Sequence, residues 1–375
     1  MNGKALLTLL ALVAIGCEGL PAEIQPQARL GSALAIAAQY AYAGPFKEGL
    51  AAMQVGDEKT GLWGLINTSG KSVIPAQCDS VQVFSDGLCA VRIGGEEGKW
   101  GFIDKLGKLA INPRFASVWP PGFVDGFAAV DVAKKYPIES AGLINKSGSF
   151  VVPARFDTIG PYREGLAIGS HWGYAPPTRS AEYFDKDGKS VFGAKFSSGG
   201  YFRDGVAPAA ISQGKLIKWG IINRAGSFVA PPNYDNVGDF SEGYASVGVG
   251  DLEAMSNDKV EYGFVDTKGE LVIPLQFNLA GDFSEGLAWV RIGDLKTGNS
   301  GIMDYDGKYA IPPKFSDASS FKEGLAAASV DGKRCGYIDK TGTFVIPPKY
   351  NSAADLSHRL GSVSVKNGDR SRWGS

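Results

Sequence analysis

One recurring ten-residue stretch decides the fold: Lys99-Trp100-Gly101-Phe102-Ile103-Asp104-Lys105-Leu106-Gly107-Lys108. It combines a Trp-Gly pair, two apolar residues, an acid, and a second glycine six residues after the first. The same glycine spacing occurs in seven copies, whose first glycines are Gly64, Gly101, Gly142, Gly220, Gly263, Gly301 and Gly336. An eighth copy has Glu182 in place of the first glycine and keeps the second, Gly188. A fixed period of this kind is the signature of a repeat architecture.

Each copy is preceded by an aromatic residue, any residue, an acid and a glycine, as in Phe46-Lys47-Glu48-Gly49. Successive acid-Gly glycines are 38 to 43 residues apart. Downstream of each copy comes an aliphatic stretch with a proline, such as Val73-Ile74-Pro75. The chain therefore contains eight repeats of about 39 residues.

The motif predicts short antiparallel strands. Asp104 to Gly107 is typical of a type I turn closed by a glycine with positive φ, in which the aspartate accepts a backbone hydrogen bond from two residues on. The flanking Phe102-Ile103 and Leu109-Ala110-Ile111 are expected to pair, and Pro113 is expected to end the second of these strands. Gly101 lies inside a strand, where glycine marks a bulge or a close backbone approach. Each repeat is thus predicted to be a meander of at least three strands.

These features predict an all-β tandem array over residues 40–374, with eight three-stranded repeats and a partial ninth. Part-repeats at both ends allow two architectures: an open superhelical β array, which we favour, or a closed β-propeller. The segment from each acid-Gly step to the next Trp-Gly position varies in length. It is therefore expected to hold a loop, and the loops are expected to lie along one face of the array.

Lys99-Trp100-Gly101 and Lys218-Trp219-Gly220, together with the aromatic-x-acid-Gly step and the Asx-x-x-Gly hairpin, resemble the bacterial WG-repeat family, also called KWG repeats. Tyr262, Ser300 and Cys335 replace the tryptophan elsewhere. The resemblance implies an all-β repeat protein that binds other macromolecules, and it supplies no catalytic residue.

The composition excludes several classes of function. The net charge of −1, from 38 basic and 39 acidic residues, argues against nucleic-acid binding. Two histidines and four cysteines without Cys-x-x-Cys spacing argue against a metal site, so neither a metal nor a cofactor is expected. Cys78 and Cys89 are expected to be buried free thiols, with a disulfide between them as the alternative. Glycine, at 51 of 375 residues, is about twice as common as usual.

The first 17 residues predict a signal peptide. The apolar run from Ala5 to Ile15 is too short to span a bilayer, and it ends in the lipobox-like Ala14-Ile15-Gly16-Cys17. We expect lipidation of Cys17, with ordinary secretion after a residue such as Ala22 as the alternative. Residues 18–39 then form a linker or cap. The protein is expected in the cell envelope as a lipoprotein, or in the periplasm or exterior, with a lipid anchor as its only membrane contact.

The recurrent acids have a structural and a functional interpretation. They could form a glycosidase-type pair or a cation site, but a residue needed in every repeat is better explained by a role in a turn. Asp185-Lys186-Asp187-Gly188 resembles part of a calcium loop yet occupies the ordinary hairpin position. The repeat tryptophans Trp63, Trp100 and Trp219 are expected to pack in the core. No catalytic residue is predicted.

The fourth repeat contains the candidate partner-binding residues His171, Trp172 and Tyr174. They belong to an early Trp-Gly followed by Pro176-Pro177, and Gly193 stands where a strand proline is expected. Exposed aromatic residues in a variable loop suit a peptide or ligand contact, whereas the alternative is an insertion that covers a core edge. A second candidate is the longest loop, from Val249 to Glu261.

The favoured function is that of a non-enzymatic, monomeric repeat protein binding a protein, peptide or glycan through its loops. The sequence leaves two alternatives open: an envelope glycan hydrolase with a carboxylate pair, and a purely structural spacer.

Overall fold

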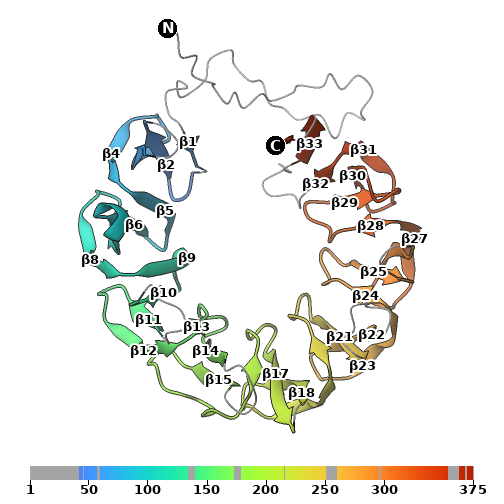
Figure 1. Cartoon of the computed structure of the whole chain (residues 1–375). Helices are drawn as coiled ribbons and strands as arrows, with labels where there is room; N and C mark the ends of the chain where they lie inside the picture. Colours follow the sequence, from blue (N-terminus) through green and yellow to red (C-terminus); the bar gives the residue numbers. More distant parts are fainter. Residues whose placement is uncertain are drawn as a thin grey trace. The chain divides into compact units, whose positions relative to one another are not determined.

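The computed structural model describes residues 42–44, 46–56, 60–133, 140–172, 179–214, 216–250, 260–294, 297–353, 363–367 and 370–374 (Figure 1). These residues form two compact units, one ending at Asn233 and the other beginning at Tyr234. The described residues contain β-strands and one short 3-10 turn, Gly95–Glu97. The expectations for residues 1–17 and 18–39, including lipidation of Cys17, concern residues outside this part of the chain.

The N-terminal unit consists of five antiparallel sheets, one for each of repeats 1 to 5. Their strands, in chain order, are β1 (Tyr42–Ala43), β2 (Leu50–Val55), β3 (Leu62–Asn67) and β4 (Ser72–Cys78); β5 (Ser80–Ser85), β6 (Leu88–Ile93), β7 (Lys99–Ile103) and β8 (Leu109–Phe115); β9 (Ser117–Val124), β10 (Phe127–Asp131), β11 (Ala141–Asn145) and β12 (Phe150–Phe156); β13 (Thr158–Ile159), β14 (Ala167–Trp172) and β15 (Arg179–Phe184); and β16 (Ser198–Gly199), β17 (Val206–Gln213), β18 (Leu216–Asn223) and β19 (Phe228–Tyr234).

The C-terminal unit continues the pattern with repeats 6 to 9. Their strands are β20 (Asn236–Val237), β21 (Tyr244–Gly250), β22 (Val260–Asp266) and β23 (Leu271–Phe277); β24 (Leu279–Ala280), β25 (Ala288–Ile292), β26 (Asn299–Met303) and β27 (Tyr309–Phe315); β28 (Asp317–Ala318), β29 (Ala326–Ser329), β30 (Cys335–Ile338) and β31 (Phe344–Tyr350); and β32 (Ser352–Ala353), β33 (Val363–Asn367) and β34 (Arg370–Gly374).

Every described sheet is built from strands that follow one another in the chain. Repeats 4 and 9 have three described strands, and each of the others has four. The all-β tandem array is therefore confirmed, with one more strand in most repeats than the minimum of three. The first sheet takes all four strands from residues 42–78, and the ninth takes its strands from residues 352–374.

The acid-Gly step is a two-residue turn between the first two strands of each of the first eight sheets. In repeat 1, Lys47 and Leu50 exchange backbone hydrogen bonds of 2.8 and 3.0 Å, while Glu48 and Gly49 have φ of 50° and 85°. Positive φ at both positions is the conformation of a type I′ hairpin. All eight recurrent acids share it: Glu48, Asp86, Asp125, Glu164, Asp204, Glu242, Glu285 and Glu323. Their predicted role in a turn is confirmed.

The second turn matches the sequence prediction. Asp104 Oδ1 accepts hydrogen bonds from the backbone N–H groups of Leu106 and Lys108, both at 2.9 Å. Gly107 closes the turn with φ of 80°, and the predicted pairs Phe102–Ile111 and Ile103–Leu109 form.

Gly101 provides a close approach between the third and fourth strands. A Cβ atom here would lie 2.6 Å from the carbonyl oxygen of Ile111 and 2.7 Å from the nitrogen of Pro113. The strand register also shifts between Trp100 and Phe102. Both interpretations of this glycine, bulge and close approach, are therefore confirmed.

The expectation that Pro113 ends the fourth strand is wrong, because β8 continues to Phe115. The proline lies against Gly101, where the register shift interrupts the regular ladder. A missing N–H is tolerated at such an irregularity of an edge strand.

The hydrophobic core lies between successive sheets. One cluster joins Phe102, Ile111 and Phe115 of repeat 2 to Phe123 and Val130 of repeat 3. The side chains of Trp63 and Trp100 are partly buried and pack against such clusters, as predicted. The described residues thus gain their burial from the contact between repeats, as in other repeat proteins.

Repeat 4 lacks the first glycine of the motif, and its sheet is correspondingly smaller. Glu182 pairs with Gly169 in the β14–β15 ladder, and its carboxylate lies 2.7 Å from Arg155. Only the isolated bridges Phe184–Ser190 and Ala181–Phe196 mark the position of a fourth strand among the described residues. A side chain at this position obstructs the close approach that Gly101 permits in repeat 2.

Cys78 and Cys89 are both buried free thiols, as predicted. They belong to the same core cluster. Burial raises the pKa of the Cys89 thiol to about 12, so it packs as a small apolar group.

Candidate functional site

Each meander of repeats 1 to 8 has two chemically different ends. The acid-Gly turn and the Asx-x-x-Gly hairpin lie at one end, which we call the turn end. The connection from the second to the third strand lies at the opposite end, the loop end, because consecutive strands are antiparallel.

The turn end carries a contact that repeats between neighbouring sheets, the inter-repeat clamp. The acid of one repeat accepts a hydrogen bond from a backbone N–H of the next repeat's acid-Gly step. It also contacts the residue that comes directly after the Asx of the next hairpin. In repeat 1, Glu48 lies 3.2 Å from the N–H nitrogen of Gly87 and 2.9 Å from Nζ of Lys105.

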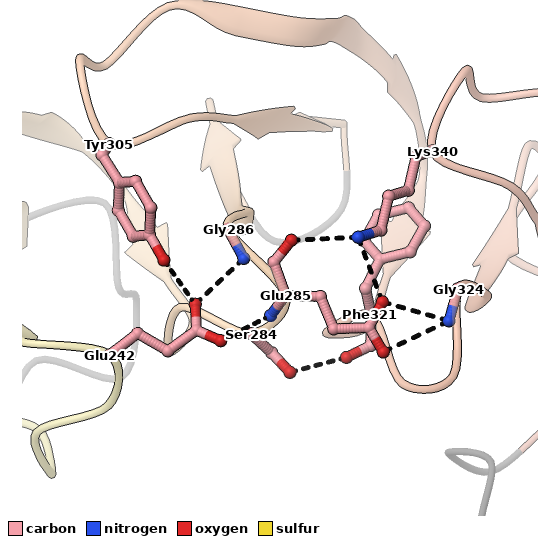
Figure 2. A network of polar contacts seen from close by, with 8 residues as sticks. All are labelled: Glu242, Ser284, Glu285, Gly286, Tyr305, Phe321, Gly324 and Lys340. Atoms are coloured by element: carbon pink, nitrogen blue, oxygen red, sulfur yellow. Dashed lines mark hydrogen bonds and ion pairs between the residues drawn. The ribbon is translucent and has the colours of Figure 1, made fainter.

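Figure 2 shows two successive clamps in the C-terminal unit. Glu242 accepts hydrogen bonds from the backbone N–H groups of Glu285 and Gly286, at 2.7 and 3.0 Å, and from the Tyr305 hydroxyl at 2.8 Å. Glu285 in turn accepts from the N–H of Gly324 at 3.0 Å and pairs with Lys340 at 3.1 Å. One carboxylate thus ties together two turns of the following repeat.

Two further clamps occur in the N-terminal unit. Asp86 lies 2.6 Å from the Gly126 nitrogen and 2.7 Å from Lys146. Glu164 lies 3.1 Å from the Gly205 nitrogen and 3.4 Å from Arg224. These acids are therefore engaged in holding repeats together.

The clamps favour ionised carboxylates. The hydrogen bond from Lys105 is the main cause of the lowered pKa of Glu48. For Asp86, partial burial raises the pKa, but the hydrogen bonds from Lys146 and Gly126 together outweigh it, so the pKa lies below its usual value. Glu242 and Glu285 show the same balance, with burial opposed by their donors.

The loop end is held at its base by a different set of side chains. Each of these residues comes directly after the fourth strand of one repeat. Its side chain accepts a hydrogen bond from a backbone N–H at the beginning of the next repeat's variable loop. They are Asp79, Asp157, Asp235 and Asn278. The distances are 2.8, 2.6, 3.0 and 2.7 Å, in that order. The bases of these loops are fixed, while their lengths and sequences differ.

The structure separates the three candidate binding residues. Trp172 is 52% exposed at the end of β14, and Asp157 holds its backbone N–H. His171 is half-buried, with its ring 4.8 Å from that of Phe156. Neighbouring strand residues point to opposite faces, so His171 packs inward and Trp172 remains accessible. Tyr174 and most of the Val249–Glu261 loop lie outside the described residues.

Two general features of the described part of the chain bear on function. It contains no group of three or more His, Cys, Asp or Glu side chains arranged to hold a metal ion. Within it, no helix has the length and apolarity needed to cross a membrane.

Sequence reasoning missed the clamp cations and the residues that fix the loop bases. The cations come directly after the hairpin Asx, as in Asp104-Lys105 and Asn145-Lys146. Three of the four loop-base residues come directly after an aromatic residue, as in Phe156-Asp157, and Asp79 follows Cys78. Both dipeptides recur in the repeats and were available as signals. Their partners, however, belong to another repeat or another strand.

Comparison with known proteins supports the repeat assignment. A family model described as "WG containing repeat" matches eight segments, which span more than half of the chain: residues 34–58, 63–96, 100–136, 142–168, 219–252, 262–295, 301–333 and 336–358. The gap from 169 to 218 contains the irregular part of repeat 4. No curated protein matches the chain.

Three solved structures illustrate the matches, all at low sequence identity. A crystal structure of the eukaryotic initiation factor matches with 11% identity and a TM-score of 0.52, covering 82% of this chain and 87% of its own. The match with BamB from Moraxella catarrhalis (11% identity, TM-score 0.37) covers 77% of this chain and 91% of the BamB chain. The β-propeller domain of the Trilobed protease from Pyrococcus furiosus (11% identity, TM-score 0.31) covers 82% and 99%. The first likeness concerns the fold alone, and the other two carry no argument about this chain.

The strand order and the recurring turns define an all-β repeat protein whose repeats are antiparallel meanders. The eight matched segments then identify the family: the chain belongs to the WG-repeat proteins.

Proposed function

We propose that this protein is a non-enzymatic, exported repeat protein that binds a protein, peptide or glycan partner with the loop ends of its repeats. One observation carries the proposal: an exposed hydrophobic residue recurs at or next to the base of the variable loop. In the N-terminal unit these residues are Val55, Ile93, Val132 and Trp172, and in the C-terminal unit they are Val249, Ile292 and Val330.

The contrast between the two ends supports this proposal. At the turn end, the clamp acids are held by backbone donors and side chains of the next repeat. At the loop end, apolar side chains remain accessible beside loops that differ in length. Exposed aromatic residues such as Trp172 are typical of binding anchors, since they bring a large contact area with few rotatable bonds. The engagement of the repeated acids in clamps also disfavours a hydrolase built on them.

Envelope fractions passed over immobilised full-length protein provide the test. We expect reproducible enrichment of a partner by the wild type and a loss of at least tenfold with Trp172→Ala. The matched control is Leu106→Ala, which removes an 86% exposed side chain from the turn end and should retain the partner. Absence of a reproducible partner, or equal loss with both variants, would contradict the proposal.

A further inference from the structure

Repeat 8 contains a cavity of about 80 Å³ at its contact with the ninth sheet. It is lined by Asp317, Ala318, Ser319, Ala327, Ala328, Ser329, Cys335 and Ala353. Cys335 stands at the Trp-Gly position of this repeat, where Trp100 stands in repeat 2. The register confirms the equivalence, since Cys335 pairs with Ser329 as Trp100 pairs with Arg92.

The cavity arises from several reductions in side-chain size. The register of the two repeats places the following smaller residues at equivalent positions: Cys335 for Trp100, Ser329 for Arg92, Ala328 for Val91, Ala318 for Val81, Ser319 for Gln82, and, in the first strand of the following sheet, Ala353 for Val118. In repeat 2 the Trp100 ring packs against the core between the sheets. In repeat 8 the same place is partly empty.

Two of the other repeats that lack the tryptophan fill its place differently. In repeat 3, where Ala141 stands at this position, Trp119 packs against the cluster that contains Ala141 and donates its indole N–H to Asp131 at 2.9 Å. In repeat 7, Ser300 stands at this position. The buried guanidinium of Arg291 lies 3.5 Å from the Ser300 hydroxyl and donates a hydrogen bond to the Ser316 carbonyl at 2.6 Å. Repeat 8 has a serine at both equivalent positions, Ser319 and Ser329.

The walls favour a flat ring with a polar edge. Ala318, Ala327, Ala328 and Ala353 contribute methyl groups, and the exposed Asp317 contributes a carboxylate. Burial, together with the charge of Asp317, raises the pKa of the Cys335 thiol, which is therefore neutral at pH 7 and acts as an apolar wall. Apolar cavities of about 150 Å³ take up a whole benzene molecule. The smaller cavity here accommodates part of a ring, consistent with the half-buried state of Trp100.

We propose that this cavity binds one indole ring, in the place that the Trp100 side chain occupies in repeat 2, with the ring N–H beside the Asp317 carboxylate. The ring belongs either to a free indole compound or to a tryptophan side chain of a peptide. The site lies at the loop end of repeat 8, because Ser329 directly precedes the exposed Val330, but it does not depend on the partner binding proposed above.

Ligand-observed NMR and calorimetry with the full chain test this site, using indole and N-acetyl-tryptophanamide as probes. The wild type should bind at least one probe saturably. Cys335→Trp fills the cavity with the protein's own indole and should weaken binding at least tenfold. Binding of indole alone assigns the site to a small molecule, whereas binding of both probes assigns it to an indole group on a larger ligand.

Two further variants separate cavity filling from general damage. The double variant Ala328→Val/Ala353→Val narrows the cavity while keeping the thiol, and it should also weaken probe binding tenfold. If Cys335→Trp does not fold, this double variant decides whether the probes bind in the cavity. Leu106→Trp adds an exposed indole to repeat 2 and should bind the probes as the wild type does. Absence of saturable binding by the wild type, or undiminished binding in the folded cavity variants, overturns the proposal.

Discussion

At the scale of single residues, the unusual choice is an acid in the left-handed region. All eight recurrent acids have φ between 47° and 56°, a conformation in which glycine or asparagine has the lower cost. In the clamps, the carboxylate compensates for this cost by accepting N–H donors from the next repeat. Glu285 shows both the strained backbone, with φ of 56°, and the compensating contacts of its carboxylate with Gly324 and Lys340.

Substitution of Glu285 separates the stabilising contribution of the carboxylate contacts from the destabilising contribution of the backbone strain. Glu285→Ala loses the carboxylate and keeps the backbone strain, so we expect a loss of about 1–2 kcal/mol in the free energy of unfolding. Glu285→Gly loses the same contacts but relieves the strain, and it should be more stable than the alanine variant by about 1 kcal/mol. Urea denaturation monitored by circular dichroism measures both.

Lys340→Ala is the matched control, because it removes the cation and leaves the acceptor for Gly324. It should cost less than about 1 kcal/mol, as expected of an exposed pair. A glycine variant less stable than the alanine variant would show that strain at Glu285 is not significant.

At the scale of the strand pair, the close approach at the Trp-Gly glycine determines whether the fourth strand can pair. Gly101 brings β7 and β8 together, and Glu182 at the equivalent position of repeat 4 accompanies a fourth strand reduced to two isolated bridges. We therefore predict that Gly101→Ala destabilises the N-terminal unit by about 2 kcal/mol, since its methyl group would overlap backbone atoms of β8.

The control for this prediction is Gly44→Ala. Its Cβ would lie 3.8 Å from the nearest atoms, so its effect should be small. Thermal melting compares the two variants, and hydrogen exchange of the β8 amides locates the damage. Equal melting temperatures for wild type and Gly101→Ala would refute the role assigned to this glycine.

The same elements show which parts of the fold could be predicted from sequence. The hairpin at Asp104 to Gly107 is a local structure, determined by an acceptor side chain and a glycine within four residues, so its sequence was sufficient. The positive φ of Glu48 was not predicted, because non-glycine residues seldom adopt it. The continuation of β8 beyond Pro113 depends on the facing Gly101, which a local rule for proline does not consider.

The candidate sites were less predictable for a related reason. Exposure of Trp172 was expected from its place beside a variable loop, whereas the inward packing of His171 depends on Phe156 from another strand. The cavity near Cys335 depends on side-chain sizes at six equivalent positions in two sheets. Such properties become visible only after the strand register has aligned the repeats.

At the scale of the whole molecule, the stability of a repeat protein is approximately a sum over repeats and the contacts between neighbours. The clamps contribute to the neighbour contacts in each compact unit. Since Glu48, Asp86, Glu242 and Glu285 have lowered pKa values in the folded protein, their contribution should depend on pH.

Proton binding determines the sign of this dependence. Carboxylates with a folded-state pKa below the unfolded value stabilise the protein above the unfolded pKa of about 4 and lose this contribution as pH falls through the folded pKa. We therefore expect the urea midpoint to be constant between about pH 7 and 6 and to fall between about pH 5 and 3. Because these side chains are partly exposed, about 0.5 M NaCl should reduce the pH dependence by screening the lysine pairs while leaving the backbone hydrogen bonds. Glu285→Gly should flatten the pH profile in proportion to its loss of stability at neutral pH, whereas a profile as steep as that of the wild type would assign acid sensitivity to other carboxylates.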